Sequence, residues 1–368
     1  MEEKLITVDK LQEKLVRKEP VFILDVRPAS ERQEWQIAGS THIDAYERLK
    51  AGDLSVLDEV DLPSDTTIVT VCAAGKTSQI ASAALRKKGI RAYSLKGGMK
   101  AWNYAWNTAE VTVAGGVRIF QIRRAAKGVL SYLVGSSGEA IVIDASLDPE
   151  VYINIAKQNG LTITYVLDTH IHADYVSRTR ELARATGAKH LLIDKARVEF
   201  GFTAISDGAS VKFGDTTLQA LHTPGHTWES TTYRLGDQAI FTGDTLFVDG
   251  VGRPDLKAEQ DEATEKARSL FRSLRKILSF SPAALVLPAH TSKTIAFDSE
   301  LVGATISEIS QNVNLTNMAE SDFVDYALSK IPPTPPNYQT ISGINIKGAY
   351  ETVDLADLEA GGNHCAIA

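Results

Sequence analysis

The segment 169–175, Thr-His-Ile-His-Ala-Asp-Tyr, constrains this chain more than any other stretch. It follows an apolar run at 163–167 that is typical of a buried strand. In an extended backbone alternate side chains point to the same face, so His170 and His172 can converge on one point. Converging imidazoles followed by Asp174 favour a metal site. A polar turn with two unrelated histidines fits the segment almost as well, so further ligands are needed.

Three other strand-like runs also end in histidine or aspartate. His226 follows a run that ends at a Pro-Gly turn, Asp244 follows Gly243, and His290 follows the apolar run 284–288. Any one of these would be an ordinary turn residue. Four strand ends that all carry metal-ligand side chains predict a metal site along one edge of a sheet.

Composition limits the classes of protein to which this chain can belong. Its 368 residues predict two to three domains on a prior of about 150 residues each. The net charge of −7, without a recurring basic cluster, argues against a nucleic-acid partner. The sequence shows neither the apolar core of a signal peptide nor an uninterrupted apolar stretch of roughly 20 residues, so we expect no membrane span. The two cysteines indicate a reducing compartment, and we expect a cytoplasmic protein. The sequence leaves a homo-oligomer open.

Cys72 is the candidate nucleophile of the first domain. A buried strand at 67–71 leads into it, and a helical pattern begins near residue 79. Backbone N–H groups at the start of that helix, together with Lys76, stabilise a thiolate and an anion attached to its sulfur. Such a thiolate can carry a sulfur atom as a persulfide. A small hydrophobic residue at a strand end is the commoner role of a lone cysteine, but the small residues around Gly75 favour an anion-binding loop.

Residues 5–106 resemble a single-domain rhodanese. The resemblance is carried by Leu-Asp-Val-Arg at 24–27, the segment 34–39, the cysteine loop, and Leu-Lys-Gly-Gly-Met-Lys-Ala-Trp at 95–102. It implies a parallel α/β sheet and a sulfur-carrying Cys72. The implied sulfur-binding loop consists of Ala73, Ala74, Gly75, Lys76, Thr77 and Ser78. Such loops often carry arginine where Thr77 stands, which makes Lys76 the only loop cation and weakens the expected thiosulfate binding.

Residues 117–294 resemble the metallo-β-lactamase fold, an αββα sandwich with metal ligands at strand ends. Asp144 matches the structural aspartate of that fold, and Gly-Arg-Pro-Asp at 252–255 resembles a segment of its persulfide dioxygenase branch. The neighbouring rhodanese-like domain points to the same branch, because both activities handle sulfane sulfur. The resemblance implies one iron(II) per chain, and its implied ligands are His170, His226 and Asp244. Residues around them, in the second shell or the pocket, are then His172, Asp174, Tyr175, His290, Trp228 and Arg253.

Two residues depart from the fold's pattern, one at the second metal position and one at the pocket rim. Tyr175 stands where dinuclear hydrolases of this fold have a histidine for their second metal. A neutral phenol is a poor ligand for a divalent ion, so Tyr175 favours one metal over two. Trp228 stands where proline is common and is expected to reshape the pocket rim. Arg253 is a candidate for binding a substrate carboxylate.

The resemblance implies a persulfide dioxygenase. Such an enzyme oxidises the persulfide of a low-molecular-weight thiol, such as glutathione persulfide, with O₂ to give sulfite and the thiol. Cys72 would exchange sulfane sulfur among persulfide, sulfite and thiosulfate. One alternative is a zinc thioester hydrolase similar to glyoxalase II, with His170, His172 and His226 on the zinc and Asp244 orienting the attacking water. Another is a non-catalytic sulfur carrier, in which the second domain is a docking module.

The expected domain order is a rhodanese-like domain at 1–108, a linker at 109–116, a metallo-β-lactamase-like domain at 117–345 and a C-terminal tail at 346–368. The linker is placed at a short polar stretch that ends in Gly115-Gly116. Cys365 lies in a Gly-rich part of the tail. We expect that part to be mobile and its thiol to be a bystander.

Overall fold

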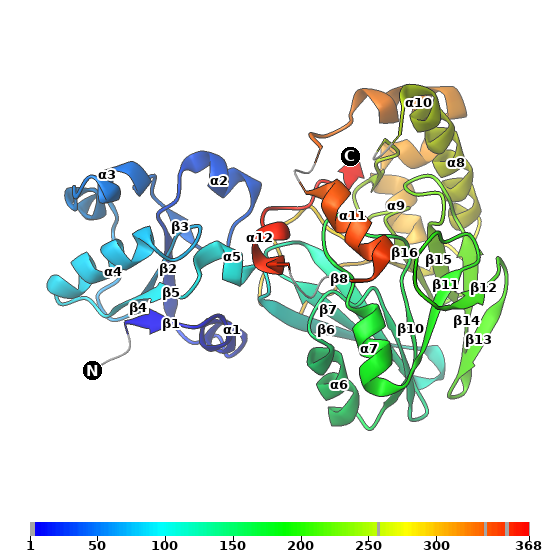
Figure 1. The fold of residues 1–368 in the computed structure, drawn as a ribbon, viewed down its shortest axis with the longest axis horizontal. Helices are drawn as coiled ribbons and strands as arrows, with labels where there is room; N and C mark the ends of the chain where they lie inside the picture. The colour runs from blue at the N-terminus through cyan, green and yellow to red at the C-terminus, as the bar shows by residue number, and fades with distance from the viewer. Residues whose placement is uncertain (1–3, 256–257, 335–336, 350–352, 368) are drawn as a thin grey trace.

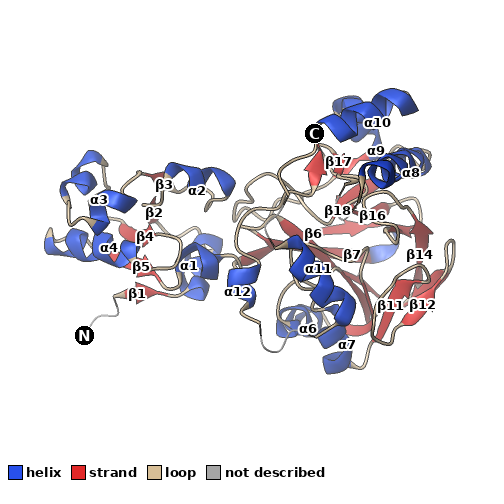
Figure 2. Cartoon of the chain, turned by 45° about the horizontal axis from the view of Figure 1, so that its top comes forward, coloured by secondary structure: helices blue, strands red, loops and turns tan. Residues whose placement is uncertain are grey.

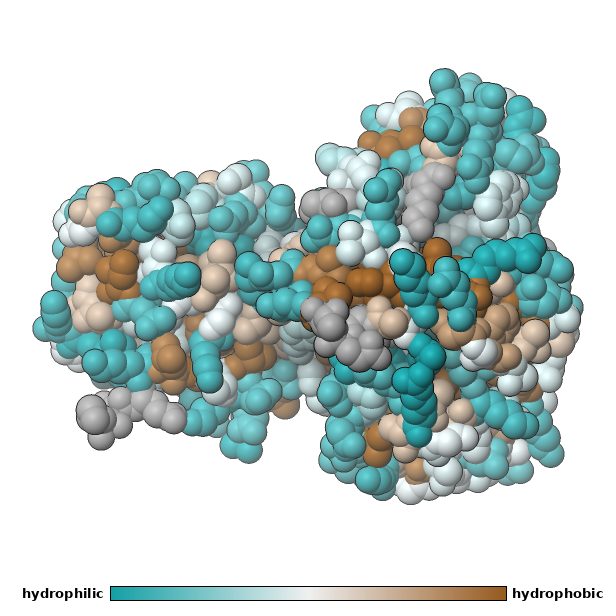
Figure 3. Space-filling view, in the orientation of Figure 1, coloured by the Kyte–Doolittle hydropathy of each residue, from teal (hydrophilic) through white to brown (hydrophobic). Residues whose placement is uncertain are grey.

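The computed structural model describes residues 4–255, 258–334, 337–349 and 353–367. The expected ranges that begin at residue 1, end at 368 or cross 350–352 therefore lie partly outside the described residues. Figure 1 shows two bodies, a small one in blue and cyan and a larger one that runs from green to red. Most of the face shown in Figure 3 is hydrophilic, and hydrophobic side chains gather near its middle, around α11 (Tyr338–Lys347) and α12 (Leu355–Leu358). Among the described helices, none is long and apolar enough to cross a membrane.

The first body is a five-stranded sheet in the order β1-β5-β4-β2-β3, and every pairing in it is parallel. Its strands are β1 (Leu5–Ile6), β2 (Val21–Asp25), β3 (Thr41–His42), β4 (Thr67–Val71) and β5 (Ala92–Leu95). Its helices are α1 (Val8–Val16), α2 (Ala29–Glu34), α3 (Tyr46–Lys50), η1 (Ser55–Glu59), α4 (Thr77–Lys87) and α5 (Gly98–Trp102). Separate apolar cores flank the sheet, one around Leu24 and Leu85 and the other around Ile23 and Trp102. The expected parallel α/β domain is confirmed.

The larger body contains two sheets packed face to face. The first has the order β12-β11-β10-β9-β8-β7-β6, and the second has the order β13-β14-β15-β16-β18-β19. Strands of the first sheet are β6 (Trp106–Val113), β7 (Val117–Arg124), β8 (Val129–Ser136), β9 (Glu139–Ile143), β10 (Thr162–Leu167), β11 (Lys189–Ile193) and β12 (Thr203–Ile205). Strands of the second are β13 (Ser210–Phe213), β14 (Thr216–His222), β15 (Thr231–Leu235), β16 (Ala239–Gly243), β18 (Leu285–Pro288) and β19 (Ala304–Thr305). Ile119, Tyr132, Leu218 and Phe241 belong to the core between the sheets.

Helices cover the outer face of each sheet (Figure 2). Tyr152 of α6 (Pro149–Gln158) and Leu182 of α7 (Thr179–Thr186) pack on the first sheet. Leu270 of α8 (Gln260–Leu278), Ile309 of α9 (Ile306–Asn312) and Phe323 of α10 (Glu320–Ser329) pack on the second. The remaining elements are η2 (Ala114–Gly116), β17 (Val251–Gly252), η3 (Asn314–Asn317), α11 (Tyr338–Lys347), α12 (Leu355–Leu358) and β20 (Ala366–Ile367). These layers form the expected αββα sandwich.

Two expected segments take other forms in the structure. Residues 109–116, expected to be a linker, form the end of β6 and the turn η2. Because β6 pairs with β7 along its whole length, the second body begins at Trp106. Gly115-Gly116 thus marks a tight turn inside a hairpin, not a domain boundary. The tail is part of the second body, because β20 pairs with β17. In the same C-terminal segment, α12 packs against α5 of the first body.

Candidate metal centre

Three buried side chains from three strand ends meet at one point. His170 follows β10, His226 lies in the turn after β14, and Asp244 follows β16. One ligand atom from each lies within 4.8 Å of the other two. Asp244 Oδ2 is 3.7 Å from His170 Nε2 and 3.6 Å from His226 Nε2. Among the described residues this oxygen has no hydrogen-bond partner. The geometry therefore presents two nitrogens and one oxygen to a common centre, as expected from the sequence.

Hydrogen bonds at the far side of each imidazole set its tautomer. The Thr169 hydroxyl donates to Asp144 Oδ2, at 2.9 Å, so the Nδ1–H of His170 donates to the Thr169 oxygen, also at 2.9 Å. His226 Nδ1 lies 2.8 Å from the Arg253 carbonyl oxygen and can only donate to it. In both rings Nε2 therefore keeps its lone pair toward the centre, which is the state a metal ligand requires.

Electrostatics favour the same protonation states. Burial lowers the pKa of His170 well below its ordinary value, and the nearby His172 adds to this effect. Burial also lowers the pKa of His226. Although burial alone would raise the pKa of Asp244, His290 and His170 hold it below its ordinary value. At neutral pH the centre thus holds two neutral imidazoles and one carboxylate, a donor set that fits a divalent ion.

Gly243 allows the close approach of the two sheets at this point. Its φ of +55° is in the left-handed region. A Cβ added there would lie 2.6 Å from Thr169 Oγ1. Any larger residue would push Asp244 away from the His170 loop, because both the backbone angle and the space exclude a side chain.

His172 and Tyr175 lie beside the centre and bind each other. The Nε2 atom of His172 is 3.1 Å from Asp144 Oδ1 and 2.9 Å from the Tyr175 hydroxyl oxygen. The two rings stack with centroids 4.3 Å apart. Burial raises the pKa of Tyr175 well above its ordinary value, so the phenol stays neutral. The structure therefore places Tyr175 as a support for His172.

A second group of donor atoms adjoins the first. His290 Nδ1 lies 2.6 Å from Asp244 Oδ1, and His290 Nε2 lies 2.9 Å from Asp174 Oδ2. Cys365 joins Asp174 and His290 in a group whose ligand atoms all lie within 4.8 Å. Only 3% of Cys365 is exposed, so the expectation of a bystander thiol in a mobile terminus is wrong about its position. Its approach depends on long-range packing of the tail, which leaves no local signal in the sequence.

The remaining expected residues divide between the pocket and the scaffold. Trp228 is 41% exposed and lines a pocket beside His226, together with Arg197, Lys266 and Tyr338. Arg253, expected to bind a substrate carboxylate, is fully buried and pairs through Nη2 with Asp255 at 2.7 Å. Its Nη1 donates to backbone carbonyls of Pro333 and His364. Arg253 is therefore a scaffold residue.

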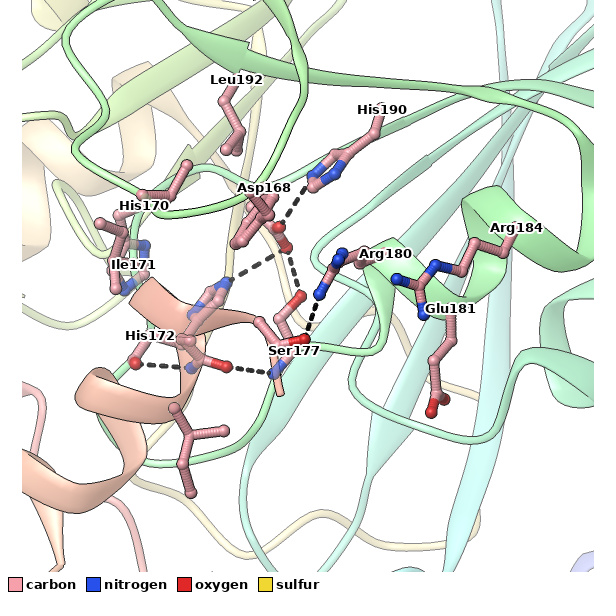
Figure 4. A pocket seen from close by; sticks show the side chains of 15 residues that line it. Asp168, His170, Ile171, His172, Ser177, Arg180, Glu181, Arg184, His190 and Leu192 are labelled. Carbon is pink, nitrogen blue, oxygen red and sulfur yellow. Dashed lines mark hydrogen bonds and ion pairs between the residues drawn. The ribbon is translucent and has the colours of Figure 1, made fainter. Parts of the chain in front are cut away.

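Sequence reasoning missed a second polar pocket, which is lined by Asp168, His190 and the His170–His172 segment (Figure 4). Asp168 accepts hydrogen bonds there from the hydroxyls of Ser177, at 2.9 Å, and Thr179, at 2.7 Å. Its Oδ2 lies 3.5 Å from Nε2 of His190. The sequence feature that could have predicted this pocket is Asp168, which directly precedes the 169–175 segment.

The cysteine loop of the first body lies between β4 and α4 and packs against the start of α5. Cys72 follows β4, is buried, and lies with its sulfur 3.2 Å from Ser78 Oγ. The Cys72 carbonyl accepts a hydrogen bond from Met99 N, at 2.9 Å. At Gly98, which has a φ of +60°, an added Cβ would lie 2.6 Å from Gly75 N and still closer to the Cys72 carbonyl. The Gly-Gly pair at 97–98 thus packs the loop against α5.

Comparisons with known proteins agree with this architecture. Residues 7–105 match the rhodanese-like domain, and residues 125–290 match the metallo-beta-lactamase superfamily. The mitochondrial persulfide dioxygenase ETHE1 of Mus musculus is 32% identical over 165 residues, which cover 44% of this chain and 63% of the mouse protein. A hydroxyacylglutathione hydrolase of Maricaulis maris is 36% identical over 120 residues, which cover 32% of this chain and 46% of the hydrolase.

A solved structure gives the same result for the fold. The structure of a metallo-beta-lactamase from Staphylococcus aureus superposes with a TM-score of 0.56 and 26% identity. The match covers 67% of this chain and 73% of the other. The chain therefore joins a rhodanese-like domain to a domain of the metallo-beta-lactamase superfamily.

Proposed function

We propose that this protein is an iron(II)-dependent persulfide dioxygenase, with one iron per chain held by His170, His226 and Asp244. The observation that carries the proposal is the open face of two imidazole nitrogens and one carboxylate oxygen. Iron(II) in such a two-histidine, one-carboxylate site supplies the chemistry of O₂ activation. The overall reaction consumes a persulfide, O₂ and water, and releases the thiol, sulfite and protons.

The chain's own residues position the substrate and control its surroundings. The ligands are buried, so the reacting sulfur is shielded from bulk water. The pocket at His226 offers the indole face of Trp228 and the cations Arg197 and Lys266. Glu229 and Glu262 line the same pocket. Groups of both charges suit a small zwitterionic thiol such as glutathione, which carries an ammonium group and carboxylates. Similarity to the mouse persulfide dioxygenase supports this substrate class.

The first body adds sulfur transfer to this scheme. Cys72 is proposed as the nucleophile that accepts sulfane sulfur as a persulfide, with the backbone of residues 73–78 around it. The start of α4 at Thr77 provides N–H groups and a favourable dipole for that anion. Cys72 would then exchange sulfur among persulfide, sulfite and thiosulfate. Because Thr77 replaces an expected arginine, we expect weak thiosulfate binding.

The test combines metal analysis of protein purified without O₂ with O₂ uptake after addition of glutathione persulfide. We expect iron, O₂ uptake and stoichiometric sulfite. Asp244→Asn should lose both iron and uptake, whereas Asp237→Asn, at a 71% exposed side chain in the turn before β16, should keep both. Cys72→Ser should lose sulfur transfer from thiosulfate and retain O₂ uptake.

The competing function is that of a zinc thioester hydrolase, which similarity to the hydroxyacylglutathione hydrolase supports. It predicts zinc as the sole metal, cleavage of a glutathione thioester and no O₂ uptake. That result would overturn the dioxygenase proposal. If His170→Ala left every activity unchanged, neither enzyme would stand, and a sulfur carrier would be the remaining explanation.

A further inference from the structure

The loop 168–178 links β10 to α7 and carries the first metal ligand of the proposed site. It contains no helix or strand before α7, and side chains from distant segments bind its backbone. The Ile171 N–H donates to Glu229 Oε1 at 3.0 Å, and the Val176 N–H donates to Glu359 Oε1 at 2.9 Å. A loop without regular structure takes its shape from contacts of this kind, because its buried backbone groups need partners.

Asn345 of α11 makes three such contacts with one side chain. Its Nδ2 donates to the carbonyl oxygens of His172 and Tyr175, both at 2.8 Å. Its Oδ1 accepts from the Ser177 N–H at 2.9 Å. Both amide hydrogens and the amide oxygen are therefore directed at the loop, and the two carbonyls and the N–H fix which way the amide faces.

Contacts at its C-terminal end hold α11 in place. The Ile346 carbonyl accepts from the Glu199 N–H at 2.8 Å, and the Gly348 carbonyl accepts from Arg180 Nη1. Gly348 has a φ of +69°, and a Cβ added there would lie 2.6 Å from atoms of Arg180 and Phe200. The helix is thus fixed closely against neighbouring segments at the end that carries the asparagine.

Hydrogen bonds lead from the backbone that Asn345 holds to the first metal ligand. Tyr175 and His172 bind each other, and His172 Nε2 lies 3.1 Å from Asp144 Oδ1. The same carboxylate oxygen accepts from the Thr169 N–H at 2.7 Å, and the Thr169 hydroxyl is bound to Nδ1 of the ligand His170. A shift of the backbone near His172 is therefore transmitted to the ligand through the shared carboxylate.

We infer that Asn345 is a positioning residue for the metal ligands and acts through the backbone of the loop 168–178. Asn345 lies beyond residues 125–290, which match the metallo-beta-lactamase superfamily, so this support comes from the C-terminal part of the chain. Loss of hydrogen-bonded support behind metal ligands typically lowers metal affinity about 10–100-fold. The inference rests on the proposed metal site, but not on the reaction that the metal supports.

The alternative is that Asn345 only docks α11 onto the second body. The loop would then keep its shape through Glu229 and Glu359, and loss of the Asn345 contacts would lower the stability of the protein without changing its metal affinity. Metal affinity, measured on folded protein, therefore separates the two roles.

Cobalt(II) is the probe, because its visible d–d bands report the geometry of the bound ion. Full-length protein loaded with cobalt(II) is titrated with a competing chelator, at a temperature where circular dichroism shows every variant folded. Asn345→Asp keeps the side-chain shape and the acceptor for Ser177, but places an oxygen against two carbonyls. We expect cobalt affinity to fall about 10-fold and the d–d bands to change. Asn345→Ala, which removes the contacts without adding a charge, should do the same.

Asn337→Asp is the matched control. Asn337 directly precedes α11, and its Nδ2 donates to a single backbone carbonyl, that of Leu358, at 2.8 Å. The control therefore removes a contact of the same kind from the same helix without touching the loop 168–178. It should keep the cobalt affinity and the d–d bands of the unaltered protein.

Unchanged cobalt affinity and d–d bands in both Asn345 variants would overturn the inference, even if their thermal stability fell. An equal loss of affinity in Asn337→Asp would overturn it as well, because docking of α11 alone would then explain the effect. Failure of the proposed function would look different: O₂ uptake would be absent, while cobalt binding and its dependence on Asn345 persisted.

Discussion

Glu359 anchors the C-terminal segment 353–367, called the strap, through a fully buried ion pair with Arg124. Glu359 Oε2 lies 2.8 Å from Arg124 Nη2, and the two side chains are 2% and 0% exposed. Glu359 Oε1 accepts from the Val176 backbone N–H at 2.9 Å. The Glu359 carbonyl accepts from Lys127 and Asn103. The carboxylate therefore satisfies donors from two separate parts of the second body, and the backbone carbonyl of the same residue accepts from two more side chains.

The substitution Glu359→Gln keeps the volume and removes the charge. An amide has one oxygen, so it can accept from Arg124 or from Val176 N but not from both, and its NH₂ group faces the other donor. Removing one partner of a buried ion pair costs about 3–5 kcal/mol, because the remaining charge is left uncompensated. For a body of this size, about 3 kcal/mol lowers Tm by roughly 6–12 °C.

Urea and thermal unfolding followed by circular dichroism measure this loss. Asp357→Asn is the matched control, because Asp357 lies on the same strap and pairs with Lys100 at the surface. Its loss should stay within about 0.5 kcal/mol. A Glu359→Gln variant as stable as the control would refute the reasoning. It would mean that the Glu359–Arg124 ion pair contributes nothing to the stability of the second body.

Three further predictions follow from the site geometry. Asp144→Asn leaves one acceptor for three donors from Thr169 and His172, so metal affinity measured by competitive chelation should fall about 10–100-fold. Gly98→Ala forces a Cβ onto the cysteine loop, so sulfur transfer from thiosulfate should be lost while O₂ uptake persists. The third concerns pH and the metal-free protein. Burial lowers the pKa values of His170 and His226, so the metal-free fold loses stability as pH falls below about 6.5. Burial opposes protonation of His290, but Asp174 and Asp244 raise its pKa to about 10, so its stabilisation is lost as pH rises from about 6.5 to 10. Urea midpoints should therefore peak near pH 6.5, and His290→Asn should reduce the alkaline decline; a flat profile would contradict this account.

Local sequence patterns were sufficient to predict the fold class and most of the residues that offer metal-ligand atoms. Apolar runs that end in His170, His226, Asp244 and His290 are visible in the sequence because buried strands are continuous apolar segments. The parallel pairing of β16 with β18 places Asp244 and His290 at one edge of the second sheet, and packing of the two sheets brings His170 to that edge. The Cys72 loop was predicted from the sequence in the same way, because it follows the apolar run at 67–71.

Tertiary structure decided which atoms face the centre and which partners hold them. Tyr175 contacts the Asp144 carbonyl, and buried Arg253 donates to the carbonyls of Pro333 and His364. These contacts join segments that are distant in the sequence. The sequence predicted a domain boundary at Gly115-Gly116, but these residues form a hairpin turn. A hairpin turn and a linker have the same composition, so the sequence does not distinguish them. The position of Cys365 is the clearest case. Its approach to the centre depends on the strap contacts made by Glu359 and Asn363, which no local pattern encodes.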